Sequence, residues 1–107
     1  MKVYDINKER ALKEDANYID YLLTKYFNPI VFNMERDEYN LDVVMSSTFF
    51  DGIPIDKRVK LVYDVLYTNA KDVLGRRFVT VQPFNTKELL EAINLLGKDW
   101  YKKDDKK

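Results

Sequence analysis

The sequence predicts a single α+β domain in which helices pack against a small three-stranded mixed sheet. Apolar residues recur first at helical and then at strand spacing, in the order helix, strand, strand, helix, strand, helix. Phe, Tyr and Trp make up 14% of the chain, which is more than a disordered chain carries. A length of 107 residues suits one hydrophobic core. The expected architecture is an αββαβα two-layer sandwich.

The first helix is predicted over residues 9–27, where apolar side chains recur every three or four positions. The stripe consists of Leu12, Ala16, Ile19, Leu22, Leu23 and Tyr26. Asp15 and Asp20 fall outside it. Asn28-Pro29 ends the helix, because a residue that precedes Pro avoids the helical conformation.

Two short strands follow, over residues 30–34 and 41–49, and the polar residues 35–40 connect them. Alternate residues share an apolar face, namely Ile30, Phe32 and Met34 in the first strand and Leu41, Val43 and Met45 in the second. A connection of hairpin length predicts antiparallel pairing.

The turn Phe50-Asp51-Gly52 leads into a second helix, which Asp56 is expected to cap and Gly75 to end. The predicted buried stripe of this helix is Val59, Val62, Val65, Leu66 and Ala70, and the predicted outer residues are Lys57, Arg58, Lys60 and Lys71. A third strand, residues 78–81, should pair in parallel with the second through a right-handed crossover.

A last helix is predicted to start at a capping box formed by Asn85 and Glu88 and to run to Gly97. The expected domain therefore covers residues 1–97, and residues 98–107 form a charged tail that should be frayed.

The net charge is zero, but its distribution is uneven. Residues 1–56 hold 6 Lys or Arg and 11 Asp or Glu, whereas residues 57–87 hold 7 and 2. A local excess of positive charge can steer an anionic partner to one face.

Several classes of protein are disfavoured by the composition. No uncharged apolar stretch approaches the ~20 residues that span a bilayer, and no apolar segment of a signal peptide follows Met1. The chain has no Cys and therefore no disulfide framework. A cytoplasmic protein is expected.

Several short motifs, in order, resemble the BolA-like family, whose fold is a class II KH-like αββαβα unit. They are the apolar strand 41–45, the turn Phe50-Asp51-Gly52, the basic helix start 57–60, the apolar residues 61–63, and the segment 79–89, which resembles the family's last strand and the start of its final helix. The resemblance runs from about residue 16 to residue 89. It implies a regulatory or interaction protein.

The family's cofactor chemistry is not carried over. BolA-like proteins usually have a His at the opening of the last strand, where this chain has Arg76-Arg77-Phe78, and many have another in the central helix, where it has Val59. Residues 35–40 lack the Cys or His that several members place in the first hairpin. An iron–sulfur cluster needs thiolate or imidazole ligands, so neither a cluster nor the family's cluster-sharing partnership with monothiol glutaredoxins is expected.

We expect no catalysis, cofactor or metal. The hydroxyl cluster Ser46-Ser47-Thr48 has no Gly-x-Ser-x-Gly elbow and no identifiable base, so we interpret it as structural. The acidic residues Glu35, Asp37 and Glu38 lack the spacing of a calcium loop and are interpreted as a solvated turn.

The predicted function is that of a noncatalytic module that binds an acidic partner, either a protein or a nucleic acid. The candidate binding residues are Lys57, Arg58, Lys60, Arg76, Arg77 and Lys87. A monomer or weak homodimer is expected.

Two alternatives remain open. One is a KH-like regulator that binds nucleic acid, although Gly52-Ile53-Pro54-Ile55 supplies only the first glycine of a Gly-x-x-Gly loop and the pI is about 6.3. The other is a small phage or mobile-element protein that inhibits a host factor. A sheet with helices mainly on one face would also leave an open face or an edge for a protein partner.

Overall fold

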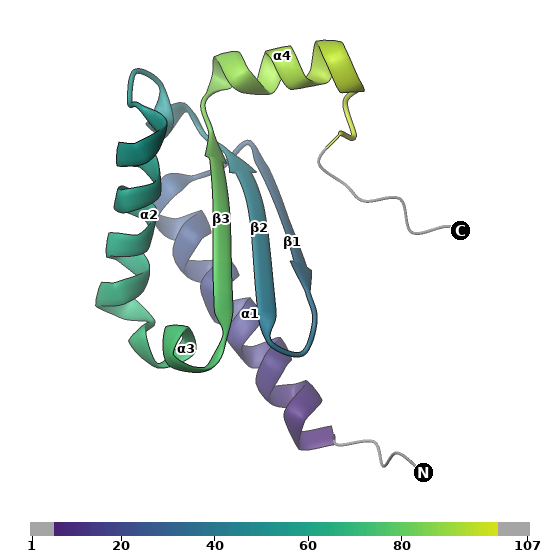
Figure 1. The fold of residues 1–107 in the computed structure, drawn as a ribbon, viewed down its shortest axis with the longest axis vertical. Helices are drawn as coiled ribbons and strands as arrows, with labels where there is room; N and C mark the ends of the chain where they lie inside the picture. Colours follow the sequence, from purple (N-terminus) through teal and green to yellow (C-terminus); the bar gives the residue numbers. More distant parts are fainter. Residues whose placement is uncertain (1–5, 101–107) are drawn as a thin grey trace.

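The computed structural model describes residues 6–100 as one small α+β unit (Figure 1). Its elements, in chain order, are α1 (Ile6–Phe27), β1 (Val31–Arg36), β2 (Asn40–Ser46), the 3-10 helix η1 (Thr48–Phe50), α2 (Ile55–Asn69), α3 (Lys71–Arg76), β3 (Phe78–Phe84) and α4 (Thr86–Leu96). The expected tail falls partly on residues 101–107, which lie outside the described residues.

The three strands form one mixed sheet in the order β1-β2-β3. β1 pairs antiparallel with β2, with Val31 opposite Ser46, and β2 pairs in parallel with β3, with Asn40 opposite Phe78. The predicted hairpin and parallel crossover are therefore confirmed.

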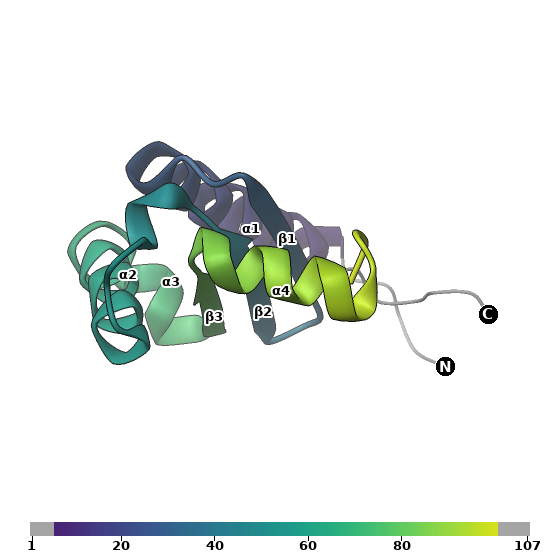
Figure 2. The ribbon, with the colours of Figure 1, turned by 90° about the horizontal axis from the view of Figure 1, so that it is seen from above.

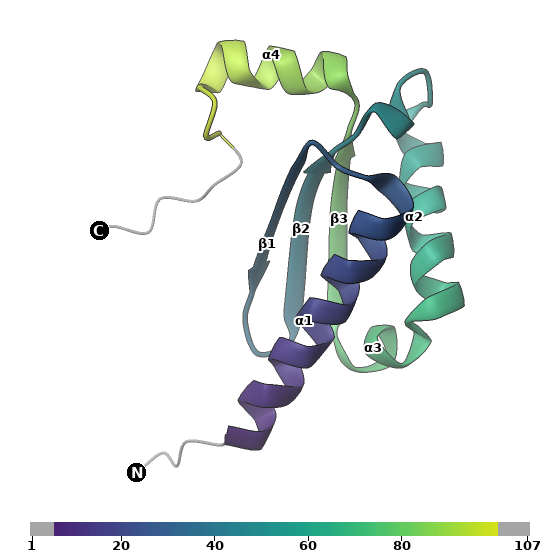
Figure 3. The same ribbon diagram turned by 180° about the vertical axis from the view of Figure 1, so that it is seen from behind.

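The hydrophobic core lies between one face of the sheet and the helices α1 and α2. Leu41, Val43 and Met45 of β2 point into it and are almost completely buried. α1 runs across this face (Figure 3), whereas α4 crosses above one end of the sheet (Figure 2). Within residues 6–100 no helix lies along the opposite face, which is turned to the viewer in Figure 1. We call this surface the open face.

The turn after β2 ties three parts of the fold together. Phe50 is fully buried and its ring lies 5.2 Å from that of Phe27. Gly52 has φ +79, a conformation that favours glycine. The carboxylate of Asp51 accepts hydrogen bonds from the backbone N–H of Thr86, at 2.9 Å, and from its hydroxyl. The turn therefore holds the first residue of α4.

The second predicted helix is divided in two. The chain leaves the helical conformation at Ala70, with φ −136, and α3 then places Val73 in the core. Gly75 lies inside α3 and does not end the first of these helices. The expected cap, Asp56, is in the first turn, because Pro54, with its fixed φ, occupies the N-cap position.

The strand ends also differ from the prediction. β2 stops at Ser46, because the buried hydroxyl of Ser47 accepts from the N–H of Phe49 and donates to the carbonyl of Phe27, which turns the chain into η1. β3 continues to Phe84 instead of ending at residue 81. Pro83 is tolerated there because β3 is an edge strand.

Three side chains lie in environments that their helical spacing did not predict. Asp15 and Arg58, expected outside the buried stripes, are only 5% and 4% exposed. Tyr26, expected inside the first stripe, is 44% exposed. Asp15 and Arg58 can be buried because each forms ion pairs with residues from distant parts of the chain.

Candidate functional site

The six predicted binding residues do not form one patch. Lys57, Arg58, Lys60 and Lys87 lie where the first turns of α2 and α4 meet, whereas Arg76 and Arg77 precede β3 at its other end. β3 has 7 residues, and at roughly 3.3 Å per residue it separates the two groups by about 20 Å.

The side chain of Arg58 is buried between the first turns of α2 and α4 and bonds to other groups of the fold. Its guanidinium donates two hydrogen bonds to the carboxylate of Glu88, at 2.6 and 3.2 Å. It also donates to the backbone carbonyls of Ile53 and Pro83, at 2.6 and 3.0 Å. The planar fork of arginine suits such a set of acceptors. A buried side chain with these partners is not available to another molecule.

The carboxylate of Glu88 makes two kinds of hydrogen bond at the start of α4. Besides binding Arg58, its carboxylate accepts from the backbone N–H of Asn85, whose side chain accepts from the N–H of Glu88. The predicted capping box is confirmed. The hydrogen bond from Arg58 lowers the pKa of Glu88, against the opposing effect of burial.

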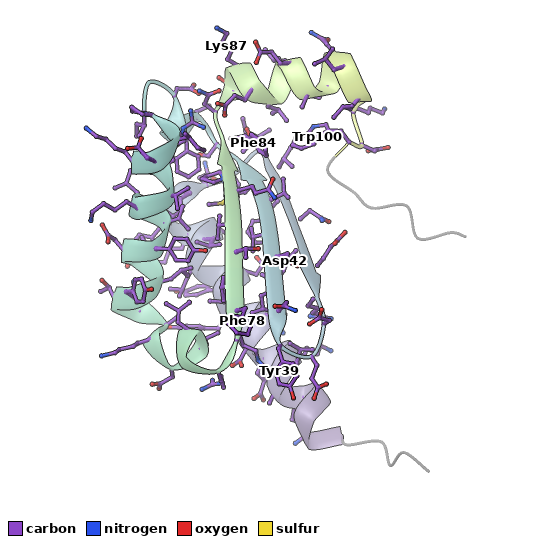
Figure 4. All side chains as sticks on the ribbon, in the orientation of Figure 1. Tyr39, Asp42, Phe78, Phe84, Lys87 and Trp100 are labelled. Atoms are coloured by element: carbon purple, nitrogen blue, oxygen red, sulfur yellow. The ribbon has the colours of Figure 1, made fainter. Side chains whose placement is uncertain are left out.

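Lys57, Lys60 and Lys87 are the exposed cations at this end, and we call them the lysine group. The ammonium of Lys60 lies 3.0 Å from the carboxylate of Asp64 on the helix surface. Among the side chains of residues 10–100, Lys57 and Lys87 have no ion-pair partner. Figure 4 shows Lys87 pointing away from the sheet at the start of α4.

The other two cations share a single buried carboxylate. Arg76 and Arg77 both donate to Asp15 of α1, at distances of 2.8–2.9 Å. Arg77 also donates to the carbonyl of Glu38 in the β1–β2 connection. Burial raises the pKa of Asp15, but hydrogen bonds from the two guanidinium groups outweigh this and hold it below its usual value.

This Asp15–Arg76–Arg77 cluster links α1, the end of α3 and the hairpin. The side chain of Arg77 is 10% exposed and that of Arg76 is 52% exposed. Sequence reasoning missed this cluster because 61 residues separate Asp15 from Arg76, and no local pattern reports so distant a pairing.

The open face carries polar side chains between two aromatic groups. Near its centre the hydroxyl of Thr80 donates to the carboxylate of Asp42, at 2.6 Å. Tyr39 and Phe78 lie at the hairpin end, and Phe84 and Trp100 lie at the α4 end (Figure 4). The rings of Phe84 and Trp100 meet edge to face, with centroids 5.2 Å apart.

Ser46, Ser47 and Asp37, which the sequence analysis considered for chemistry, make structural contacts. Ser46 and Ser47 are buried, and each hydroxyl bonds to a backbone carbonyl. The side-chain amide of Asn40 and the backbone N–H groups of Tyr39 and Asn40 donate to the carboxylate of Asp37, and these hydrogen bonds lower its pKa. No group of three potential metal ligands occurs within residues 6–100.

An iron–sulfur cluster does not fit this chain, which has neither Cys nor His. The three positions where family members carry His or Cys hold other groups here. Arg77 is engaged with Asp15, Val59 has a hydrocarbon side chain, and residues 35–40 include neither Cys nor His.

Comparison with known structures places this fold among BolA proteins. BolA1 from Arabidopsis thaliana is 22% identical, with a TM-score of 0.59 over 69% of this chain and 94% of that one. The BolA domain of SufE1 from the same plant is 22% identical, with a TM-score of 0.58 over 68% and 93%. A BolA-like protein from Babesia bovis is 16% identical, with a TM-score of 0.60 over 74% and 92%.

No protein-family model and no curated protein sequence matches the chain. The structural matches show that the chain has the BolA fold, as the sequence motifs predicted. No helix among residues 6–100 is long and apolar enough to cross a membrane.

Proposed function

We propose that this chain is a noncatalytic interaction module of the BolA type, which binds an acidic partner protein through the lysine group. The observation that supports this most is that the arginines and the lysines have different surroundings in the fold. Arg58, Arg76 and Arg77 are bound to carboxylates of distant elements, whereas Lys57 and Lys87 face solvent and Lys60 pairs only with Asp64 on the surface of its own helix.

The helix starts that carry Lys57 and Lys87 are joined by side-chain hydrogen bonds. Arg58 and Glu88 join the first turns of α2 and α4, and Asp51 holds Thr86. Lys57 and Lys87 therefore project from two helix starts whose relative position is fixed. The ammonium group of a lysine sits on a flexible side chain, so it suits a reversible ionic contact with a partner protein.

A protein partner fits this end better than a nucleic acid does. Asp56 precedes Lys57, and Asp64 pairs with Lys60, so carboxylates lie among the cations. A phosphate backbone would meet these like charges, whereas a protein surface can match both signs.

The BolA fold also occurs as one part of a larger protein, since the structural relative from SufE1 is a BolA domain. A module of this kind contributes a surface to an assembly. The absence of Cys and His in the sequence agrees with a noncatalytic role.

Affinity capture with a charge-reversed variant tests the proposal. Purified wild-type protein and the variant K57E/K60E/K87E would be used to capture proteins from a nuclease-treated lysate of the source cells. The matched control, K13E/K71E/K98E, changes three exposed lysines elsewhere. We expect the same acidic protein to be recovered by the wild type and the control, and its recovery by the lysine-group variant to fall at least about tenfold, as expected when several charge contacts are lost.

Equal recovery by all three proteins would contradict the proposal, and so would the absence of any specifically recovered protein. Capture that disappears with nuclease treatment would favour the nucleic-acid alternative. In that case log affinity should fall steeply with log salt.

A further inference from the structure

The open face differs in charge from the lysine group. By strand alternation its side chains come from Val31, Asn33, Glu35, Asn40, Asp42, Val44, Phe78, Thr80, Gln82 and Phe84, whereas Ser46 on the same side of β2 is fully buried. Two of them are carboxylates and none is a cation. Arg36, the one strand residue with a positive charge, alternates to the opposite side with Phe32 and Met34.

The carboxylate of Asp42 remains exposed near the centre of this face. Among the side chains described, those of residues 10–100, Thr80 is its one hydrogen-bond donor and no cation forms an ion pair with it. An exposed carboxylate beside half-buried Val44 attracts a cation that brings apolar surface with it.

The ends of the face are apolar. Phe78 is 73% exposed, and its backbone N–H bonds to the carbonyl of Tyr39, which is 57% exposed. At the other end, Phe84 packs against Trp100. Aromatic side chains in these positions are the usual anchors of a protein interface.

The distance between the aromatic ends limits what can lie there. Phe78 and Phe84 are the first and last residues of β3, so at ~3.3 Å per residue they are about 20 Å apart. A helix that covers this distance has about 13 residues at 1.5 Å per residue. The other face of the same sheet is already covered by helices, with α1 running across it (Figure 3).

We propose that the open face binds a basic amphipathic helix of a partner protein. The helix lies along the strands, with a Lys or Arg side chain toward Asp42 and with apolar residues at Phe78 and at Phe84. Helix addition would turn the two-layer fold into three layers, a common way to cover a sheet. This surface is separate from the lysine group, and its partner has the opposite charge.

An NMR titration with synthetic helices tests this inference. The probes are two 14-residue helical peptides with the same Leu and Trp face, one with a Lys polar face and one with a Glu polar face. We expect the Lys peptide to shift the backbone amides of Asp42, Val44, Phe78 and Thr80 at submillimolar concentration, and the Glu peptide to leave them unchanged at 1 mM.

Two variants locate the contact. Asp42→Asn keeps an oxygen acceptor for Thr80 but removes the charge, and Phe78→Thr removes the aromatic anchor while keeping a strand-forming residue. Each should weaken binding of the Lys peptide about fivefold, which corresponds to roughly 1 kcal/mol. Glu14→Gln, on the exposed side of α1, is the matched control and should leave the affinity unchanged.

Several results would overturn the inference. They are equal shifts with both peptides, shifts confined to α1 and α2, no shift at 1 mM, or the same shifts with calcium ions alone. None of these results depends on the lysine group, so failure here and failure of the proposed function are distinguishable.

Discussion

Among single residues, the side chains with buried charges are arginines and acids, and the exposed cations proposed to bind a partner are lysines. The guanidinium groups of Arg58 and Arg77 each reach several fixed acceptors in the fold. A guanidinium tolerates such burial because its fork satisfies several acceptors at once. The same partners make these arginines part of the structure.

Replacing the shared carboxylate should destabilise the protein. In Asp15→Asn two guanidinium groups lose their common anion, and we expect the free energy of unfolding to fall by about 2 kcal/mol. Urea unfolding measures this, with Glu14→Gln as the neighbouring control. If both variants unfold at the same urea concentration, the cluster does not stabilise the fold.

The same carboxylates make stability depend on pH. The pKa values of Asp15 and Glu88 are lowered in the folded state by their arginine partners, so each contributes stability above its unfolded pKa, about 4. That contribution is lost as pH falls through the lower folded values. We expect the free energy of unfolding to decrease below about pH 4, and D15N/E88Q to show a shallower decrease. Parallel pH curves for the two proteins would contradict this.

Gly52→Ala tests the turn before α2. A β-carbon there would meet no atom within 4 Å, but φ is +79. The left-handed conformation costs a non-glycine residue about 1 kcal/mol, so thermal unfolding should occur at a lower temperature. Gly75→Ala, with φ in the ordinary range and equally open space, is the control and should not lower it. An unchanged unfolding temperature for Gly52→Ala would contradict this, because it would mean that the positive φ at this position does not require glycine.

Among the helices and strands, α4 depends most on a few polar contacts. Its buried apolar residue is Leu89, whereas Leu90, Leu95 and Leu96 are 60–81% exposed. Its first turn is held by Arg58 through Glu88 and by Asp51 through Thr86. We infer that α4 keeps its place mainly through these contacts.

Substitution of Arg58 should therefore release α4. In Arg58→Met the carboxylate of Glu88 and two carbonyls lose their donor, and we expect a loss of about 3 kcal/mol. Hydrogen exchange should show faster exchange in α4 than the global loss alone explains. Lys60→Met, two residues further along α2, is the control. Uniform exchange across β3 and α4 would contradict this role.

For the folded chain, the sequence predicted the order of elements and the pairing of the strands. The spacing of apolar residues predicted the helices and strands, and the capping box of Asn85 and Glu88 predicted the start of α4. The break at Ala70 was not predictable, because Ala favours helix and the burial of Val73 decides the turn.

The candidate site was less predictable than the fold. Positive charge counted along residues 57–87 does not reveal which side chains are neutralised by the fold. Arg58 and Arg76 find carboxylates 30 and 61 residues away, so their exposure depends on tertiary structure. That the six cations bind a partner stays a prediction. We now propose this role only for the three exposed lysines, Lys57, Lys60 and Lys87.

The most direct measurement compares two charge changes in one capture assay. Recovery of the acidic partner would be quantified for K57E/K60E/K87E and for Arg76→Gln, each expressed per folded molecule. Our interpretation predicts at least about a tenfold loss for the lysine variant and unchanged recovery for the arginine variant, which should only unfold more easily. Loss of the partner with Arg76→Gln, together with its retention by the lysine variant, would contradict it.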